Sequence, residues 1–141
     1  MFHLTEEHEA VREAARQFAQ NDLKPGVIER DTKMQYPREQ VRKMAELGFL
    51  GMMTAPEYGG GGMDTLAYVI AMEEISKVDS SCSVIMSVNN SLVCWGIETY
   101  GTEEQKQKYL PKLASGEWIG SFCLSEPEAG SDATSQRTTA V

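Results

Sequence analysis

Hydrophobic residues recur at helical spacing through most of the chain. A first helix is predicted to begin at Thr5, whose hydroxyl can cap the N–H groups of the first turn. Its inward face is expected to hold four apolar residues, Val11, Ala14, Ala15 and Phe18. Lys24-Pro25-Gly26 predicts a break before a short helical turn over residues 27–31. Another helix is expected to start at Pro37 and to end in a cap at Gly48.

Two longer segments predict the central helices. The first begins near Asp64, ends near Val78 and has apolar residues on both sides, which is typical of a helix with neighbours all round; these residues are Leu66, Tyr68, Val69, Ile70, Met72 and Ile75. The second spans residues 80–97, carries no charged residue and is expected to be capped by Asp79. It is too polar to cross a membrane, so a buried helix is expected.

The buried helix poses a question about its polar residues. Its apolar residues are expected in the core, namely Val84, Ile85, Val88, Leu92 and Trp95. The small polar residues between them include Asn89 and Asn90. A buried polar group needs a partner, so these side chains either find partners within the bundle or line a cavity.

The pattern changes near residue 117. Thr102 and Gln105 form a capping box for a helix in which Pro111 is expected to cause a kink or a restart. Residues 118–125 then alternate apolar with smaller residues, which predicts a strand. One strand cannot form a sheet alone, so we expect the chain to end inside a second domain. The expected division is 1–117 for the helical domain and 118–141 for the start of a β domain.

Composition narrows the possible functions. The 141 residues include 13 basic and 21 acidic side chains, and the net charge of −8 disfavours nucleic-acid binding. No secretory signal is evident, which favours the bacterial cytoplasm or, after processing, the mitochondrial matrix. Three cysteines without metal or redox spacing are expected to be buried free thiols, Cys82, Cys94 and Cys123. His3 and His8 are expected to be solvated, and no metal site is predicted.

Two segments rich in glycine or serine have the composition of ligand-binding loops. The four glycines at 59–62 predict a loop, but they lack the phosphate-binding pattern of a lysine and a hydroxyl residue after the last glycine. The turn at 126–132 offers N–H groups and the hydroxyls of Ser125 and Ser131 to a flat heterocycle or a pyrophosphate. The residue types alone are equally compatible with an ordinary surface turn.

The order of residues in this turn resembles a known family. FCLSEPEAGSD, from Phe122 to Asp132, is similar to the flavin-contacting signature of the acyl-CoA dehydrogenases, an aromatic residue, any residue, an aliphatic residue, serine or threonine, Glu-Pro, two variable positions and Gly-Ser-Asp. PEYGG at 56–60 resembles a loop of the same family, and SVIMSVNNSL at 83–92 resembles its short-chain branch. Residues 100–106 and 109–116 are similar to the helix before the strand. The resemblance extends over essentially the whole chain.

The resemblance implies a fold and a set of site residues. In the family an N-terminal helical domain precedes a middle β domain and a C-terminal four-helix domain, so this all-α segment would be the first domain and the opening strand of the second. Phe122, Leu124 and Ser125 would approach the isoalloxazine ring of FAD. Gly130 and Ser131 would meet the FAD pyrophosphate, and Ser131 would also face the CoA portion of the substrate.

The implied reaction is the oxidation of a short-chain acyl-CoA to the trans-2-enoyl-CoA. In the family a glutamate removes the α-proton while the β-hydrogen leaves as hydride to the flavin. That glutamate lies after the β domain, so no catalytic residue is assigned here and the segment alone is expected to be inactive. Glu98, Glu126 and Glu128 are interpreted as surface or turn residues.

The resemblance also implies partners and leaves alternatives. Electron-transfer flavoprotein would accept the electrons, and the full-length protein would form a homotetramer without contacting nucleic acid or membrane. A flavin oxidase or monooxygenase of the same fold is one alternative, and a non-catalytic helical module that holds a partner is another.

Overall fold

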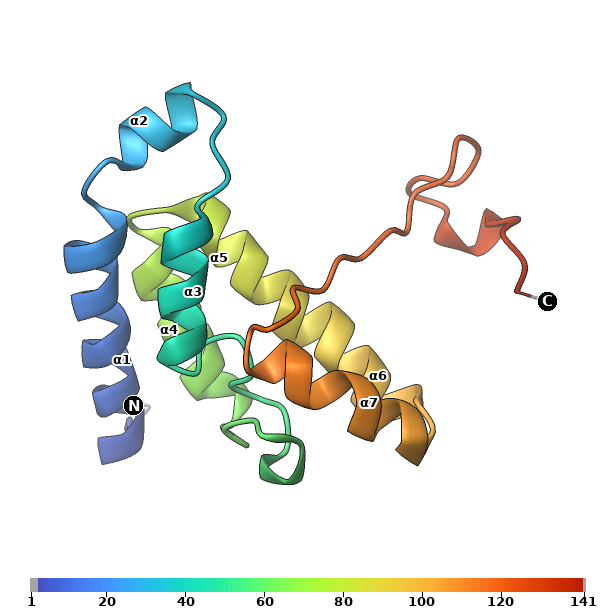
Figure 1. Cartoon of the computed structure of the whole chain (residues 1–141), viewed down its shortest axis with the longest axis horizontal. Helices are drawn as coiled ribbons and strands as arrows, with labels where there is room; N and C mark the ends of the chain where they lie inside the picture. Colours follow the sequence, from blue (N-terminus) through green and yellow to red (C-terminus); the bar gives the residue numbers. More distant parts are fainter. Residues whose placement is uncertain (1–2, 141) are drawn as a thin grey trace.

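Seven α-helices carry the fold in the computed structural model, which describes residues 3–140 (Figure 1). They are α1 (Glu6–Phe18), α2 (Val27–Thr32), α3 (Arg38–Glu46), α4 (Thr65–Ser76), α5 (Ser80–Ser87), α6 (Trp95–Tyr100) and α7 (Glu103–Ala114). Two π-helical segments, Ala19–Leu23 and Val88–Cys94, extend α1 and join α5 to α6. Short 3-10 turns lie at Pro56–Tyr58 and Ala133–Ser135. The helical fold predicted from the sequence is confirmed.

The start of α1 depends on a buried histidine. The Thr5 hydroxyl caps α1 as predicted and accepts from the His8 N–H at 3.2 Å, and His8 Nδ1 accepts the Thr5 N–H at 3.2 Å. His8 Nε2 lies 3.1 Å from both carboxylate oxygens of Asp64. The prediction that His8 is solvated is therefore wrong, whereas His3 is exposed as predicted. The capping box turns the ring inward, towards the start of α4.

Helix α4 is the main neighbour of α1. Asp64 caps it by accepting the Ala67 N–H at 2.8 Å. The buried Glu74 accepts two hydrogen bonds from Arg16 of α1, at 3.1 and 3.2 Å, and one from Lys77 at 3.0 Å. On the other side of α4, Leu66 and Val69 are exposed but Ile70 is buried, so the prediction of neighbours all round this helix is correct only in part.

In the continuous helical run from α5 to α6, several residues differ from their expected burial. Asp79 caps it as predicted, by accepting the Cys82 N–H at 3.0 Å. Three residues expected in the core are exposed, namely Val84, Leu92 and Trp95. Asn89 and Asn90 are fully buried instead. The cause is that neighbouring backbone carbonyls face this side of the run, and amides can satisfy them where apolar side chains cannot.

The glycine-rich loop packs closely on a neighbouring segment. Gly61, Gly62 and Met63 donate N–H groups to the carbonyls of Gly51, Thr54 and Met52, at 2.8, 2.9 and 2.8 Å. A side chain at Gly60 would place its Cβ 2.0 Å from the Thr54 carbonyl oxygen. The glycines therefore permit backbone to approach backbone, and the phosphate-binding interpretation is not needed.

The end of the chain departs from the helices. Pro111 lies inside α7, which begins at the predicted Thr102–Gln105 capping box and continues to Ala114 without a restart. Beyond it, after a bend at residues 117–118, the segment from residue 119 to 125 is extended and runs away from the helices (Figure 1). No strand forms between residues 3 and 140, because no second segment pairs with this one; the only bridge joins Glu126 to Ala129. No helix in this range is long and apolar enough to cross a membrane.

Replacement of Asp64 tests the junction of α1 and α4. Asp64→Ala removes the acceptor for the Ala67 N–H and the partner of His8, so we expect the free energy of unfolding to fall by about 1–2 kcal/mol. Asp64→Asn keeps a capping oxygen and serves as the matched control. Urea denaturation of both variants checks this expectation, and equal losses would contradict it.

Glu74 should make stability depend on pH. The hydrogen bonds from Arg16, followed by those from Lys77, lower the pKa of Glu74 from 4.5 to about 2. Because the pKa is depressed in the folded state, its contribution is complete above the unfolded value and is lost as the pH falls from 4.5 towards 2. Glu74→Gln should cost roughly 2 kcal/mol at pH 7 and less at pH 3.

Thermal denaturation of the Glu74 variant at both pH values provides the measurement. Glu13→Gln is the control, because Glu13 is exposed and its oxygen lies 3.9 Å from Arg16, and this change should cost less than about 0.5 kcal/mol. A Glu74→Gln effect that does not vary between pH 7 and pH 3 would refute the proposed pKa contribution.

Candidate functional site

The extended segment carries three of the predicted site residues and is attached to the helices just before them. The Trp118 N–H donates to the Lys112 carbonyl at 3.0 Å, and the Lys112 ammonium lies 4.4 Å from the centre of the Trp118 ring. Two residues later, the Gly120 N–H donates to Asn89 Oδ1 at 2.8 Å. These contacts fix the direction in which the segment leaves α7.

Phe122, Leu124 and Ser125 present both apolar and polar groups to solvent. Phe122 is 50% exposed and Leu124 is 40% exposed, which is unusual for large hydrophobic side chains. The Gln136 amide donates to the Leu124 carbonyl at 2.5 Å. Within residues 3–140, no hydrogen bond occupies the N–H groups of Leu124 and Ser125 or the Ser125 hydroxyl. A ligand with a flat ring and polar edge atoms would satisfy both kinds of group.

A tight turn follows the extended segment. The Glu126 N–H donates to the Ala129 carbonyl at 3.0 Å, and the Ala129 N–H donates back at 3.2 Å. The Glu126 carboxylate accepts the N–H groups of Arg137 and Thr138, at 2.8 and 3.0 Å, and the Thr138 hydroxyl. Residues 137 and 138 are thereby joined to the turn, which closes a small loop.

The far side of the turn is open. Gly130 and Ser131 are exposed, and a Cβ on Gly130 would meet no atom within 4 Å. The next residue, Asp132, accepts the hydroxyls of Thr134 and Ser135, at 2.6 and 2.5 Å. The five residues predicted to bind the cofactor thus lie on the extended segment and on the turn that follows it, and their contact with FAD stays a prediction.

The three glutamates interpreted as surface or turn residues are already engaged by other groups. The Thr138 hydroxyl, followed by the N–H groups of Arg137 and Thr138, lowers the pKa of Glu126, which makes it a weak base. Glu98 accepts the Ala55 N–H at 3.2 Å, and Glu128 lies 3.5 Å from the Arg137 guanidinium. These contacts agree with the interpretation of Glu126 and Glu128 as turn residues, whereas Glu98 is half-buried on α6.

Asn89 is the residue that sequence reasoning did not connect with the site. Its Nδ2 donates to the carbonyls of Leu50 and Leu113, at 2.8 and 3.1 Å, while its Oδ1 receives the Gly120 N–H. Asn90 beside it donates to the carbonyls of Phe49 and Met86, at 2.8 and 3.0 Å. Its buried Oδ1 has no partner among the described residues, and nothing in the structure explains this. The signal in the sequence was two consecutive asparagines in a helix without charges.

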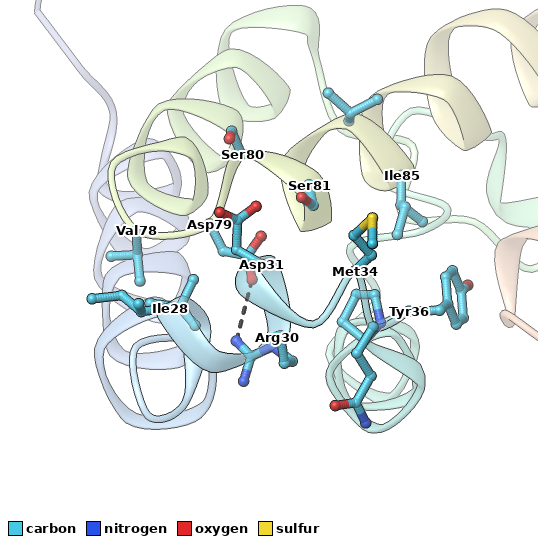
Figure 2. A pocket seen from close by; sticks show the side chains of 14 residues that line it. Ile28, Arg30, Asp31, Met34, Tyr36, Val78, Asp79, Ser80, Ser81 and Ile85 are labelled. Carbon is cyan, nitrogen blue, oxygen red and sulfur yellow. Dashed lines mark hydrogen bonds and ion pairs between the residues drawn. The ribbon is translucent and has the colours of Figure 1, made fainter.

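The two asparagines answer the question that the sequence left open. The interpretation as satisfied polar groups is correct for Asn89, and for Asn90 it is correct only for Nδ2, because the Asn90 Oδ1 has no partner among the described residues. Ser80 and Ser81 instead line an open groove of about 960 Å³ (Figure 2). The groove lies between α2, the 34–37 segment and the start of α5, and an Arg30–Asp79 ion pair of 3.2 Å lies beside it. None of the five predicted cofactor residues lines it.

The remaining expectations concern metals and thiols. In the range 3–140 no group of three or more metal-ligating side chains comes together. Cys82 and Cys94 are buried free thiols as predicted, and burial raises the pKa of each, to about 12 and about 11. The prediction is wrong for Cys123, which is exposed because the segment that carries it has no neighbouring layer within the described residues.

Comparison with known proteins places the chain in a family. The family model described as acyl-CoA dehydrogenase, N-terminal domain, matches residues 5–117. A short-chain specific acyl-CoA dehydrogenase from Clostridium acetobutylicum is 49% identical over 140 residues, which are 99% of this chain and 37% of the relative. The chain therefore spans little more than a third of that relative's length.

Solved structures agree with this relationship. A chain solved in work on the electron transferring flavoprotein of Acidaminococcus fermentans superposes with a TM-score of 0.94 at 46% identity, covering 99% of this chain and 37% of that one. A glutaryl-CoA dehydrogenase from Mycobacterium smegmatis in complex with FADH2 superposes at 0.90 with 36% identity, covering 96% and 35%. With its helical fold and the family match over most of its length, the chain belongs to the acyl-CoA dehydrogenase family and corresponds to its N-terminal domain.

Proposed function

We propose that this segment belongs to a flavin-dependent acyl-CoA dehydrogenase that oxidises short-chain acyl-CoA to trans-2-enoyl-CoA. The observation that carries the proposal is the FCLSEPEAGSD segment, whose Leu124 and Ser125 donors are unpaired among the described residues and lie next to solvent-facing apolar side chains. The short-chain specificity of the Clostridium acetobutylicum relative supports the substrate class.

The residues present fit FAD. The Leu124 and Ser125 N–H groups and the Ser125 hydroxyl would hold the polar edge of the isoalloxazine ring, while Phe122 and Leu124 would supply apolar contact. The open backbone at Gly130 and the Ser131 hydroxyl would receive the pyrophosphate. The glutaryl-CoA dehydrogenase structure with FADH2 supports the same cofactor for a related fold. Bound FAD would accept the hydride that leaves the substrate.

The segment would contribute binding and orientation but no base. Ser131 would also face the CoA portion of the substrate, and the glutamate that removes the α-proton would lie in the part of the parent protein outside this segment. Electron-transfer flavoprotein is the proposed electron acceptor, and the parent is proposed to be a homotetramer. The structure solved in work on an electron transferring flavoprotein supports the acceptor by similarity.

Purification of the full-length parent tests the function. We expect a yellow protein whose flavin is bleached anaerobically by butyryl-CoA, and turnover in the presence of a dye acceptor. The 141-residue segment, with FAD added, should show no turnover because it lacks the base. A parent that is purified colourless and cannot be reconstituted with FAD would refute the proposal. Rapid reoxidation of the reduced parent by air would instead favour an oxidase.

Ser125 offers a test of the cofactor contacts. In the full-length parent, Ser125→Ala should raise the FAD dissociation constant about tenfold, because one hydrogen bond to the ring is lost. Ser121→Ala is the matched control, since Ser121 is exposed on the same segment and is assigned no contact. Fluorescence titration of each apoprotein with FAD gives the constants, and identical constants for the two variants would remove Ser125 from the site.

A further inference from the structure

The last hydrogen bond between the helices and the extended segment, before the predicted flavin contacts begin, is made by one buried side chain. Among the residues that the structure describes, Gly120 is the last one before Phe122 whose backbone is hydrogen-bonded to the helices. Its N–H reaches Asn89 Oδ1 at 2.8 Å, across 31 positions of sequence. Only Ser121 separates Gly120 from Phe122, the first predicted flavin contact.

The orientation of the Asn89 amide is determined by its surroundings. Its Nδ2 faces two carbonyl oxygens, those of Leu50 and Leu113, and a carbonyl oxygen can only accept. Rotation of the amide by half a turn would set oxygen against both carbonyls and nitrogen against the Gly120 N–H. The oxygen must therefore point at Gly120, and the side chain is 0% exposed, so water cannot replace it.

Close packing against Val93 also fixes the position of Gly120. A Cβ on Gly120 would lie 2.7 Å from Val93 Cγ1 and 2.8 Å from Val93 Cβ, which means that the backbone rests directly on the π-helical segment Val88–Cys94. Asn89 and Val93 belong to this one segment. A hydrogen bond and a steric contact from the same element thus define the position of Gly120.

We propose that Asn89 is a positioning residue, which holds the FAD-contacting segment in register through the Gly120 N–H. This inference rests on the proposed function, since only the proposed function gives the exposed segment a flavin to contact. Asn89 itself would touch neither the cofactor nor the substrate. Its loss would let Phe122, Leu124 and Ser125 move relative to the flavin ring, and small misplacements of this kind carry large rate penalties.

Asn90 provides a matched control for the test. It is the adjacent residue of the same type, equally buried, and it donates to two backbone carbonyls, neither of which belongs to the extended segment. In the full-length holoenzyme, Asn89→Ala and Asn90→Ala should both lower the melting temperature. Only Asn89→Ala should change the flavin absorption spectrum, raise flavin fluorescence and lower kcat for butyryl-CoA by about tenfold or more, with a smaller change in KM.

A second pair of variants covers the case in which Asn89→Ala does not fold. Gly120→Ala would push the segment away from Val93, whereas Gly96→Ala meets no atom within 4 Å. The first should reproduce the spectral change and the loss of kcat, and the second should leave both unchanged. Spectra and kcat that do not distinguish Asn89→Ala from Asn90→Ala, or Gly120→Ala from Gly96→Ala, would overturn the inference. A wild-type parent that binds no FAD would refute the proposed function instead, whatever these variants do.

Discussion

The structure depends on the hydrogen bonds of one buried amide. Asn89 joins four parts of the chain, since it lies in the π-helical segment between α5 and α6 and contacts Leu50 after α3, Leu113 at the end of α7 and Gly120 in the extended segment. The Leu50 carbonyl and the Gly120 N–H have no other hydrogen bond among the described residues, whereas the Leu113 carbonyl, near the end of α7, also accepts the Gly116 N–H at 3.2 Å. Because an unpaired buried group costs about 1–3 kcal/mol, the three partners and the amide stabilise one arrangement together.

The π-helical geometry makes this arrangement possible. A π-helical turn joins residues five positions apart by its hydrogen bonds, is rare, and frequently occurs at functional sites. Here it turns two consecutive asparagines towards the interior, and it leaves Leu92 and Trp95 exposed on the same run. The exposed apolar surface of these residues, with that of Phe122 and Leu124, is the kind that a further layer of protein covers. The Clostridium acetobutylicum relative has additional chain available for this, because the present segment spans only 37% of it.

The local signals in the sequence predicted the caps correctly, whereas they predicted burial only in part. The caps at Thr5, Asp64, Asp79 and Thr102 depend on residues three positions apart, and all of them form. Burial depends on which distant segment lies opposite. His8 is buried because Asp64 faces it across 56 positions, and Cys123 is exposed because nothing within the described residues packs on its segment. The predicted strand required a partner strand, which residues 3–140 do not supply.

For the candidate site too, the local order of residues was informative, whereas the contacts with distant residues that position the segment could not be predicted. The order of residues from Phe122 to Asp132 is a local property, so its resemblance to a family signature could identify the segment and its donors from the sequence alone. The position of that segment is set elsewhere, by an amide and a valine in a helix whose own sequence contains no ligand-binding motif. Judged by burial alone, a substitution at Asn89 would be expected only to destabilise the core. The contact with Gly120 gives such a substitution a second expected consequence, because in our proposal Asn89 maintains, from inside the helical domain, the geometry of a segment predicted to contact FAD.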